Sequence, residues 1–141
     1  MQNIIVNPKI CSGCRACEAA CTAQHEERFG IAAARIRVVK VEALGIDRPH
    51  VCRQCNNAPC VAACPEGTLY RDERTGAVLQ HQDLCTGCEA CAEACPFDMV
   101  SMHPQSGLAL ICDLCGGDPE CVKRCATGAI TYGDSWKRDA A

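Results

Sequence analysis

Alternating apolar and polar positions predict two hairpins in the second half of the chain. Two short runs, 68–71 and 77–80, flank a polar turn that ends in Gly76. Such runs, separated by a turn that closes on glycine, are typical of antiparallel strand pairs. The same arrangement returns in the stretch 99–111. Both stretches are therefore expected to form hairpins.

Helix-forming residues gather in two other segments. Residues 18–25 and 89–94 are rich in Ala and Glu, which predicts two short helices. Each helix is expected to carry the fourth cysteine of a group of four. Residues 34–43 alternate well enough for one more strand, which the segment 45–49 is expected to end. No flexible linker interrupts the chain, so the pattern favours one compact α+β unit, residues 1–141, with two internal halves.

The composition changes what the interior of this unit must contain. The 141 residues include sixteen Cys but only two Phe, two Tyr and one Trp, so a core of large side chains would be thin. A cysteine-dense chain is held together by disulfides in an oxidising compartment or by metal in a reducing one. The start of the chain has no basic segment followed by an apolar run, and no stretch approaches eighteen apolar residues. We therefore expect a cytoplasmic protein without direct membrane insertion, in which metal binds reduced thiols.

The cysteines form an internal repeat of four groups, with none left over. The first and third groups share the spacing C-x2-C-x2-C-x3-C, whereas the second and fourth widen the middle gap to four and five residues. The groups are Cys11, Cys14, Cys17 and Cys21; Cys52, Cys55, Cys60 and Cys64; Cys85, Cys88, Cys91 and Cys95; and Cys112, Cys115, Cys121 and Cys125.

This spacing is typical of 4Fe-4S clusters. A C-x2-C-x2-C loop can wrap around one cubane and reach three of its corners, so the fourth ligand must come from elsewhere. In the bacterial ferredoxin run C-x2-C-x2-C-x3-C-P, the last cysteine binds the other cluster of a pair. Pro65 and Pro96 follow the second and third groups, whereas Thr22 and Ala126 stand at the matching places in the outer groups. The sequence therefore predicts four 4Fe-4S clusters and sixteen cysteine ligands.

Other cysteine chemistries fit less well. Structural zinc usually takes two C-x2-C pairs with a longer spacer, and three cysteines within seven residues would crowd one ion. A disulfide framework conflicts with the missing export signal, and 3Fe or 2Fe centres remain conceivable although every group keeps four ligands. The four histidines are interpreted as surface, loop or hydrogen-bonding residues, not ligands: His25, His50, His81 and His103.

Charge and missing motifs narrow the function. The formal net charge is −3, and four oxidised clusters with their thiolates would bring it to roughly −11. Because Lys and Arg are scattered, nucleic acid is not expected as a partner. Four basic residues stand between cluster ligands, as solvated charges, as groups that raise the reduction potential or as contacts for an acidic partner: Arg15, Arg53, Lys123 and Arg124. The sequence shows no G-x-G-x-x-G, P-loop or H-E-x-x-H motif, so we expect no catalysis by this chain.

From about residue 3 to residue 132, the chain resembles the four-cluster ferredoxin-like electron-transfer subunits of dimethyl sulfoxide reductase-type enzymes, carbon monoxide dehydrogenase and hydrogenase systems, and tungsten aldehyde oxidoreductases. The segments that carry the resemblance are 7–21, 52–60 and 112–115. It implies two bacterial-ferredoxin-like modules, an inner one of about 50–100 and an outer one of about 1–30 with 104–132. The implied ligand sets are Cys11, Cys14, Cys17 and Cys125; Cys112, Cys115, Cys121 and Cys21; Cys52, Cys55, Cys60 and Cys95; and Cys85, Cys88, Cys91 and Cys64.

A row of one-electron centres is useful mainly as a conductor between two partners. We expect a non-catalytic subunit that relays electrons between a large tungsten- or molybdenum-pterin subunit, with an aldehyde oxidoreductase favoured, and a flavin subunit, membrane anchor or further carrier. Formate dehydrogenase, carbon monoxide dehydrogenase or hydrogenase partners stay open, as do self-assembly and a freely diffusing polyferredoxin. Trp136, in the polar end of the chain, either anchors a partner or packs on its own domain.

Overall fold

The structure is a computed structural model that describes residues 2–27 and 32–134; Trp136 lies outside them. Its α-helices are α1 (Ala16–Glu26), α2 (Pro59–Ala63), α3 (Ala90–Ala94) and α4 (Glu120–Arg124). Its strands are β1 (Gln2–Val6), β2 (Arg37–Val41), β3 (Ile46–His50), β4 (Leu69–Arg71), β5 (Val78–Gln80), β6 (Ser101–Met102), β7 (Ala109–Leu110) and β8 (Ile130–Asp134). Short 3-10 turns lie at Pro8–Ile10, Glu42–Leu44 and Leu114–Gly117. This is an α+β arrangement of short elements.

The described strands pair into four small antiparallel sheets. β4 pairs with β5, which places Tyr70 opposite Leu79, and β6 pairs with β7, which places Ser101 opposite Leu110. Both hairpins predicted from the sequence are therefore confirmed. Each runs directly from one cysteine group to the next.

The strand predicted within residues 34–43 is present as β2 and ends before Gly45, but the segment 45–49, expected only to end it, forms most of a second strand. Gly45, with a left-handed φ of +63°, makes the tight turn, and β3 then runs antiparallel to β2. Pro49 stands inside β3 opposite Val38. A proline without an N–H is tolerated there because β3 is the edge of a two-stranded ribbon.

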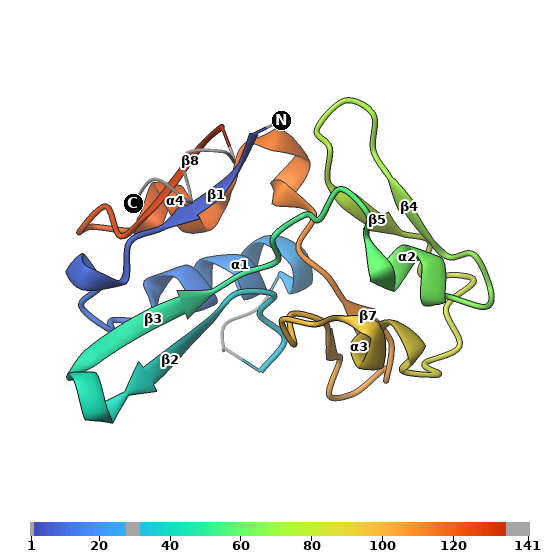
Figure 1. Ribbon diagram of the computed structural model, residues 1–141, viewed down its shortest axis with the longest axis horizontal. Helices are drawn as coiled ribbons and strands as arrows, with labels where there is room; N and C mark the ends of the chain where they lie inside the picture. Colours follow the sequence, from blue (N-terminus) through green and yellow to red (C-terminus); the bar gives the residue numbers. More distant parts are fainter. Residues whose placement is uncertain (1, 28–31, 135–141) are drawn as a thin grey trace.

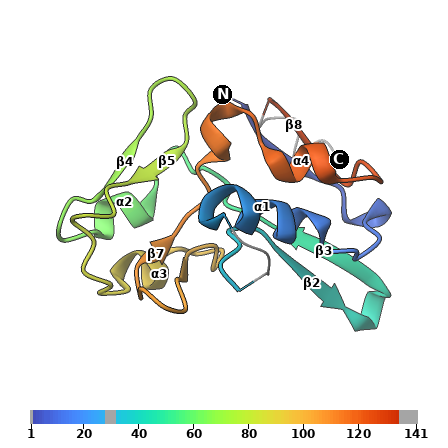
Figure 2. The same cartoon turned by 180° about the vertical axis from the view of Figure 1, so that it is seen from behind.

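The two ends of the described chain meet in space. β1 and β8 form a sheet in which Ile4 lies opposite Tyr132, and α1 packs against α4 behind it (Figures 1 and 2). Ile4 and Ile130 are almost completely buried in this contact. The first and last cysteine groups are thereby brought into one half of the molecule.

The helix prediction was right for Cys21 and off by one residue elsewhere. α1 carries Cys21 within its length, but α2, α3 and α4 end just before Cys64, Cys95 and Cys125, which adopt extended conformations. Pro65 and Pro96 give the reason at two of these places, because a residue before proline avoids the helical region.

Buried side chains form two clusters. One contains Ile4, Ile36, Val38, Leu114 and Ile130 together with cysteines of the first and fourth groups. The other lies under the two hairpins and contains Leu69, Val78, Val100, Ala109 and Ile111 together with cysteines of the second and third groups. In Figure 1, β1, β2 and β8, which carry residues of the first cluster, lie to the left, and β4, β5 and β7, which carry residues of the second, lie to the right. No helix of the described part is long and apolar enough to cross a membrane.

Candidate metal centres

Cysteines from different groups line three separate hollows of similar size. One of about 320 Å³ is lined by Cys85, Cys88 and Cys91 with Cys64. Another of about 340 Å³ is lined by Cys52, Cys55 and Cys60 with Cys95. The last, of about 300 Å³, is lined by Cys11, Cys14 and Cys17 with Cys125. Each hollow thus receives three cysteines from one group and the fourth cysteine of another.

The remaining four cysteines are also neighbours. Burial, together with the nearby sulfurs of Cys21 and Cys115, raises the pKa of Cys121 to about 12. Cys112 is buried, and its pKa is raised well above normal by burial and by neighbours that include Cys121 and Cys21. Cys21, Cys112, Cys115 and Cys121 are the four cysteines expected to form the remaining ligand set. Cluster ligation by all four sets stays a prediction.

A left-handed residue in each cysteine loop turns the chain around its hollow. It directly precedes the second cysteine of the group and is Gly13, Gln54, Gly87 or Leu114, with φ of +73°, +51°, +75° and +57°. At Gly87 a Cβ would also lie only 2.7 Å from the carbonyl oxygen of Gly107. The backbone turn is therefore the same in all four loops, although two of the residues are not glycine.

The chemistry of the sulfurs fits a multiply charged metal cluster. Burial raises the pKa of Cys17 and of Cys52 to about 11, so without metal these thiols stay protonated at neutral pH. Facing sulfurs that are buried together become thiolates only when a cation compensates their charge. The buried thiols therefore favour metal binding, and the free energy of that binding would also stabilise the folded chain.

The last cysteine of each group accepts hydrogen bonds. The amide of Thr68 lies 3.4 Å from Cys64 Sγ and its hydroxyl 3.1 Å away, and the amide of Met99 lies 3.3 Å from Cys95 Sγ. Cys125 Sγ lies 3.6 Å from the Thr127 hydroxyl. Burial disfavours the thiolate of Cys64, but these donors outweigh it and lower the pKa of Cys64. Hydrogen bonds to sulfur tune cluster potentials.

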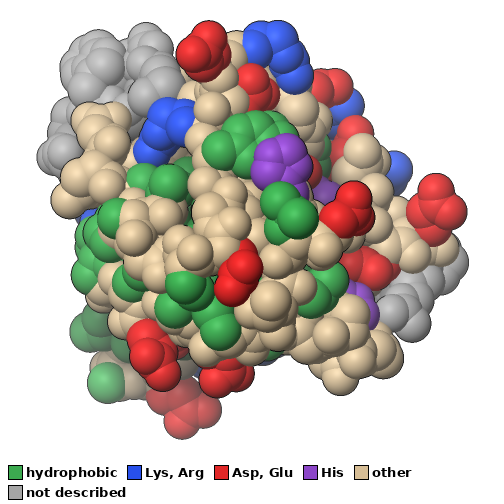
Figure 3. Space-filling view, turned by 90° about the vertical axis from the view of Figure 1, so that its right-hand side faces the viewer, with side chains coloured by type: hydrophobic (Ala, Val, Ile, Leu, Met, Phe, Trp, Pro, Cys, Tyr) green, Lys and Arg blue, Asp and Glu red, His purple; other side chains and the backbone are tan. Residues whose placement is uncertain are grey.

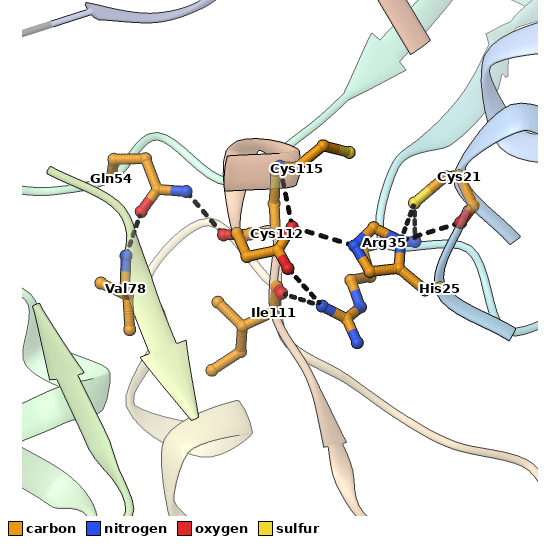
Figure 4. Close-up of polar contacts among 9 residues, drawn as sticks. Cys21, His25, Arg35, Gln54, Val78, Ile111, Cys112 and Cys115 are labelled. Atoms are coloured by element: carbon orange, nitrogen blue, oxygen red, sulfur yellow. Dashed lines mark hydrogen bonds and ion pairs between the residues drawn. The ribbon is translucent and has the colours of Figure 1, made fainter. Parts of the chain in front are cut away.

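A charged network that the sequence did not reveal surrounds Cys21 (Figure 4). The Arg35 amide donates to Cys21 Sγ at 3.2 Å, and His25 Nδ1 lies 2.8 Å from the Cys21 carbonyl oxygen and 3.6 Å from Cys21 Sγ. His25 Nε2 and Asp113 Oδ1 are 2.9 Å apart. Burial opposes a charge on His25, but the carboxylate of Asp113 raises the pKa of His25 well above its usual value. Positive charge therefore lies beside one sulfur.

Two other histidines also make contacts within the described chain. His81 stacks on Tyr70 with ring centroids 4.4 Å apart, and His103 Nε2 lies 3.2 Å from a Glu26 carboxylate oxygen. Arg53 lies over the Phe97 ring, 4.0 Å from its centroid, at the edge of the hollow that contains Cys95. Arg53 and Phe97 thus form part of the wall of one candidate site.

One end of the molecule exposes both sulfur and apolar side chains. Cys88 is exposed at the hollow nearest this end, and Leu84 is 54% exposed in the same loop. Seen from this end in Figure 3, green apolar side chains are interspersed with acidic ones, and the Lys and Arg side chains stand apart from one another. A candidate ligand so close to the surface would give a redox partner a short route to the site.

Sixteen cysteines in cubane spacings, twelve of them around three hollows of similar size, define an iron-sulfur protein of the 4Fe-4S class that serves electron transport. Residues 45–135 match the family model of the 4Fe-4S dicluster domain, and the chain belongs to this family.

Two relatives of this chain are named as a polyferredoxin-like subunit and an electron transfer subunit. Over 122 residues the chain is 46% identical to the polyferredoxin-like subunit of an aliphatic sulfonate oxidoreductase from Pyrococcus furiosus, covering 86% of this chain and 70% of that one. It is 36% identical over 138 residues to the thiosulfate reductase electron transfer subunit PhsB of Salmonella typhi, covering 89% and 71%.

A solved structure shares the fold. A chain in the active-site complex BamBC of benzoyl coenzyme A reductase, determined with zinc, matches with a TM-score of 0.56 and 29% identity, covering 94% of this chain and 78% of that one. The similarity extends over nearly all of the present chain.

Proposed function

We propose that this chain holds four 4Fe-4S clusters and conducts electrons between a large catalytic subunit of an oxidoreductase and a second redox partner. The clusters belong to two modules, about 50–100 and about 1–30 with 104–132. Each cluster takes three ligands from one cysteine group and one from the group that pairs with it. The sets are Cys11, Cys14, Cys17, Cys125; Cys112, Cys115, Cys121, Cys21; Cys52, Cys55, Cys60, Cys95; and Cys85, Cys88, Cys91, Cys64.

The observation that carries this proposal is the lining of the three hollows. In each, the fourth cysteine comes from a distant part of the chain, such as Cys125 beside Cys11. A chain that used each group for its own small ion would keep all four cysteines of a group together. Crossed sets are instead the arrangement of two-cluster ferredoxins.

The residues of the chain have separate tasks in this function. A 4Fe-4S cluster, when bound, takes up and releases one electron at a time. The cysteines bind iron, and the left-handed loop residues bring three of them to one side of it. Hydrogen-bond donors such as Thr68 and Met99 stabilise negative charge on sulfur. The buried apolar residues keep water away from the buried cysteine ligands.

A tungsten- or molybdenum-pterin enzyme is the proposed catalytic partner, with an aldehyde oxidoreductase favoured and a flavin subunit or another carrier as the second partner. Two relatives are named as subunits of a sulfonate oxidoreductase and of a thiosulfate reductase, which supports a role in electron exchange with a catalytic chain. The similarity to a chain of an active-site complex supports direct assembly of the present chain with its catalytic subunit.

Anaerobic purification from the native source tests this function. We expect the brown chain to co-elute with a large subunit that contains tungsten or molybdenum and a pterin. A lone 15.1 kDa brown protein that reduces several separate enzymes would instead indicate a free polyferredoxin. A large partner without pterin would overturn the assignment of the partner but not that of the clusters.

A further inference from the structure

A buried glutamine lies where the two halves of the molecule meet. Gln54 lies between Cys52 and Cys55, and its side chain points away from its own loop toward the other half of the molecule (Figure 4). Its Nε2 donates to the carbonyl oxygen of Cys112 at 2.7 Å, and its Oε1 accepts from the amide of Val78 at 2.9 Å. Only 7% of Gln54 is exposed. One side chain thus binds a residue in each buried cluster.

The same residue also contacts a sulfur. The backbone amide of Gln54 lies 3.4 Å from Cys52 Sγ. A continuous route therefore runs from Cys52 Sγ through the amide and side chain of Gln54 to the carbonyl group of Cys112, with a hydrogen bond at each end. The two sulfurs also lie near enough for Cys52 to be among the charges that act on Cys112.

The backbone of Gln54 makes this contact possible at a conformational cost. Its φ of +51° is left-handed, where two of the other loops have Gly13 and Gly87. Glycine adopts this conformation with little strain, whereas glutamine does not. The side chain that replaces glycine here makes two buried hydrogen bonds to other segments, which offset that strain. A strained residue at a contact between two halves is the kind of position where function is found.

We propose that Gln54 is the positioning residue through which electrons pass between the two modules, from the Cys52 set to the Cys112 set or back. This role rests on the proposed function, because it requires clusters at both sets. Each transfer takes one electron from a reduced 4Fe-4S centre at one set and gives it to an oxidised centre at the other. No bond is formed or broken, and no proton moves.

The decisive variant is Gln54→Met, which keeps the length and flexibility of the side chain and removes both polar atoms. Gln80→Met is the matched control. Gln80 lies on β5, two residues after Val78, and its buried Nε2 has no hydrogen-bond partner within the described residues. Both variants therefore remove a glutamine whose side-chain nitrogen is buried, although Gln80 as a whole is only half-buried, and only Gln54→Met breaks a contact between the halves.

The holoprotein receives less than one electron per chain from a photoexcited ruthenium complex, and rapid-freeze EPR follows how the electron spreads among the clusters. In Gln54→Met we expect transfer between modules to be slower than in the wild type, because the hydrogen-bonded route from Cys52 to the Cys112 carbonyl group is broken. Iron content should stay at the wild-type value. In Gln80→Met the transfer rate should equal that of the wild type.

An unchanged rate in Gln54→Met with full iron content would overturn the role of Gln54, as would equal slowing in Gln80→Met. If Gln54→Met loses iron, the same experiment is made on Gln54→Glu, which keeps the acceptor for Val78: slowing supports the role and an unchanged rate refutes it. Failure of the proposed function has a different signature, because the wild type itself would then lack iron or the EPR signal of reduced clusters.

Discussion

Replacing Thr68 with valine should shift the reduction potential of a single cluster. The Thr68 hydroxyl lies 3.1 Å from Cys64 Sγ and the residue is 2% exposed, so the bond is sheltered from water. Thr68→Val has nearly the same shape and keeps the backbone amide, which lies 3.4 Å from the sulfur. Only the hydroxyl donor is lost.

The size of the shift follows from the hydrogen bond. A bond to a charged group contributes about 1.5–3 kcal/mol, and only the part that differs between the oxidised and reduced states changes the potential. If that part is about 1 kcal/mol, one-electron reduction becomes harder by roughly 40 mV. The direction is downward, because the donor stabilises the more negative, reduced state.

An EPR-monitored redox titration of the anaerobic protein measures this shift. The potential of the cluster at the Cys64 set should fall, and those of the other clusters should stay within error. Thr127→Val is the control, because its hydroxyl lies 3.6 Å from Cys125 Sγ and should affect a different cluster, more weakly. No shift in Thr68→Val, an upward shift, or an equal shift of all clusters would refute the reasoning.

Three other substitutions have distinct expected results. Glu18→Ala removes the carboxylate oxygen that accepts a hydrogen bond from the Val38 amide at 2.5 Å. This change should cost about 2 kcal/mol of stability and lower the thermal midpoint of unfolding. Glu73→Ala, at an exposed position, should leave the thermal midpoint unchanged. Ile4→Ala, at a position 1% exposed, should cost about 2–5 kcal/mol, and an unchanged midpoint would contradict its place in the core. Cys125→Ala should remove or convert the cluster held by the first three cysteines of the chain, which EPR can follow; selective damage to the cluster of its own group would refute the crossed sets.

Local features of the chain were predictable from the sequence because they depend on near neighbours. The hairpin of β4 and β5 follows from alternating residues around Gly76, and the cysteine groups follow from their spacing. The pairing of β3 with β2 was missed because Pro49 reads as a strand breaker. A proline at an edge is acceptable only once the sheet has two strands, which a local pattern does not contain.

Contacts between segments that are distant along the chain could not be predicted from the sequence. Gln54 and Cys112 are 58 residues apart, and His25 and Asp113 are 88 apart. Neither pair stands out by spacing, because the contacts exist only after the two ends of the chain come together. A glutamine before the second cysteine, where two other groups have glycine, was the one visible signal for the first pair.

Metal and sulfide analysis of the anaerobically purified chain tests the central claim most directly. Four 4Fe-4S clusters require about sixteen iron and about sixteen acid-labile sulfide per chain, with the brown colour and reduced EPR signals of such clusters. A colourless protein with about four zinc and no sulfide would contradict the account, because the same cysteines would then serve structure alone.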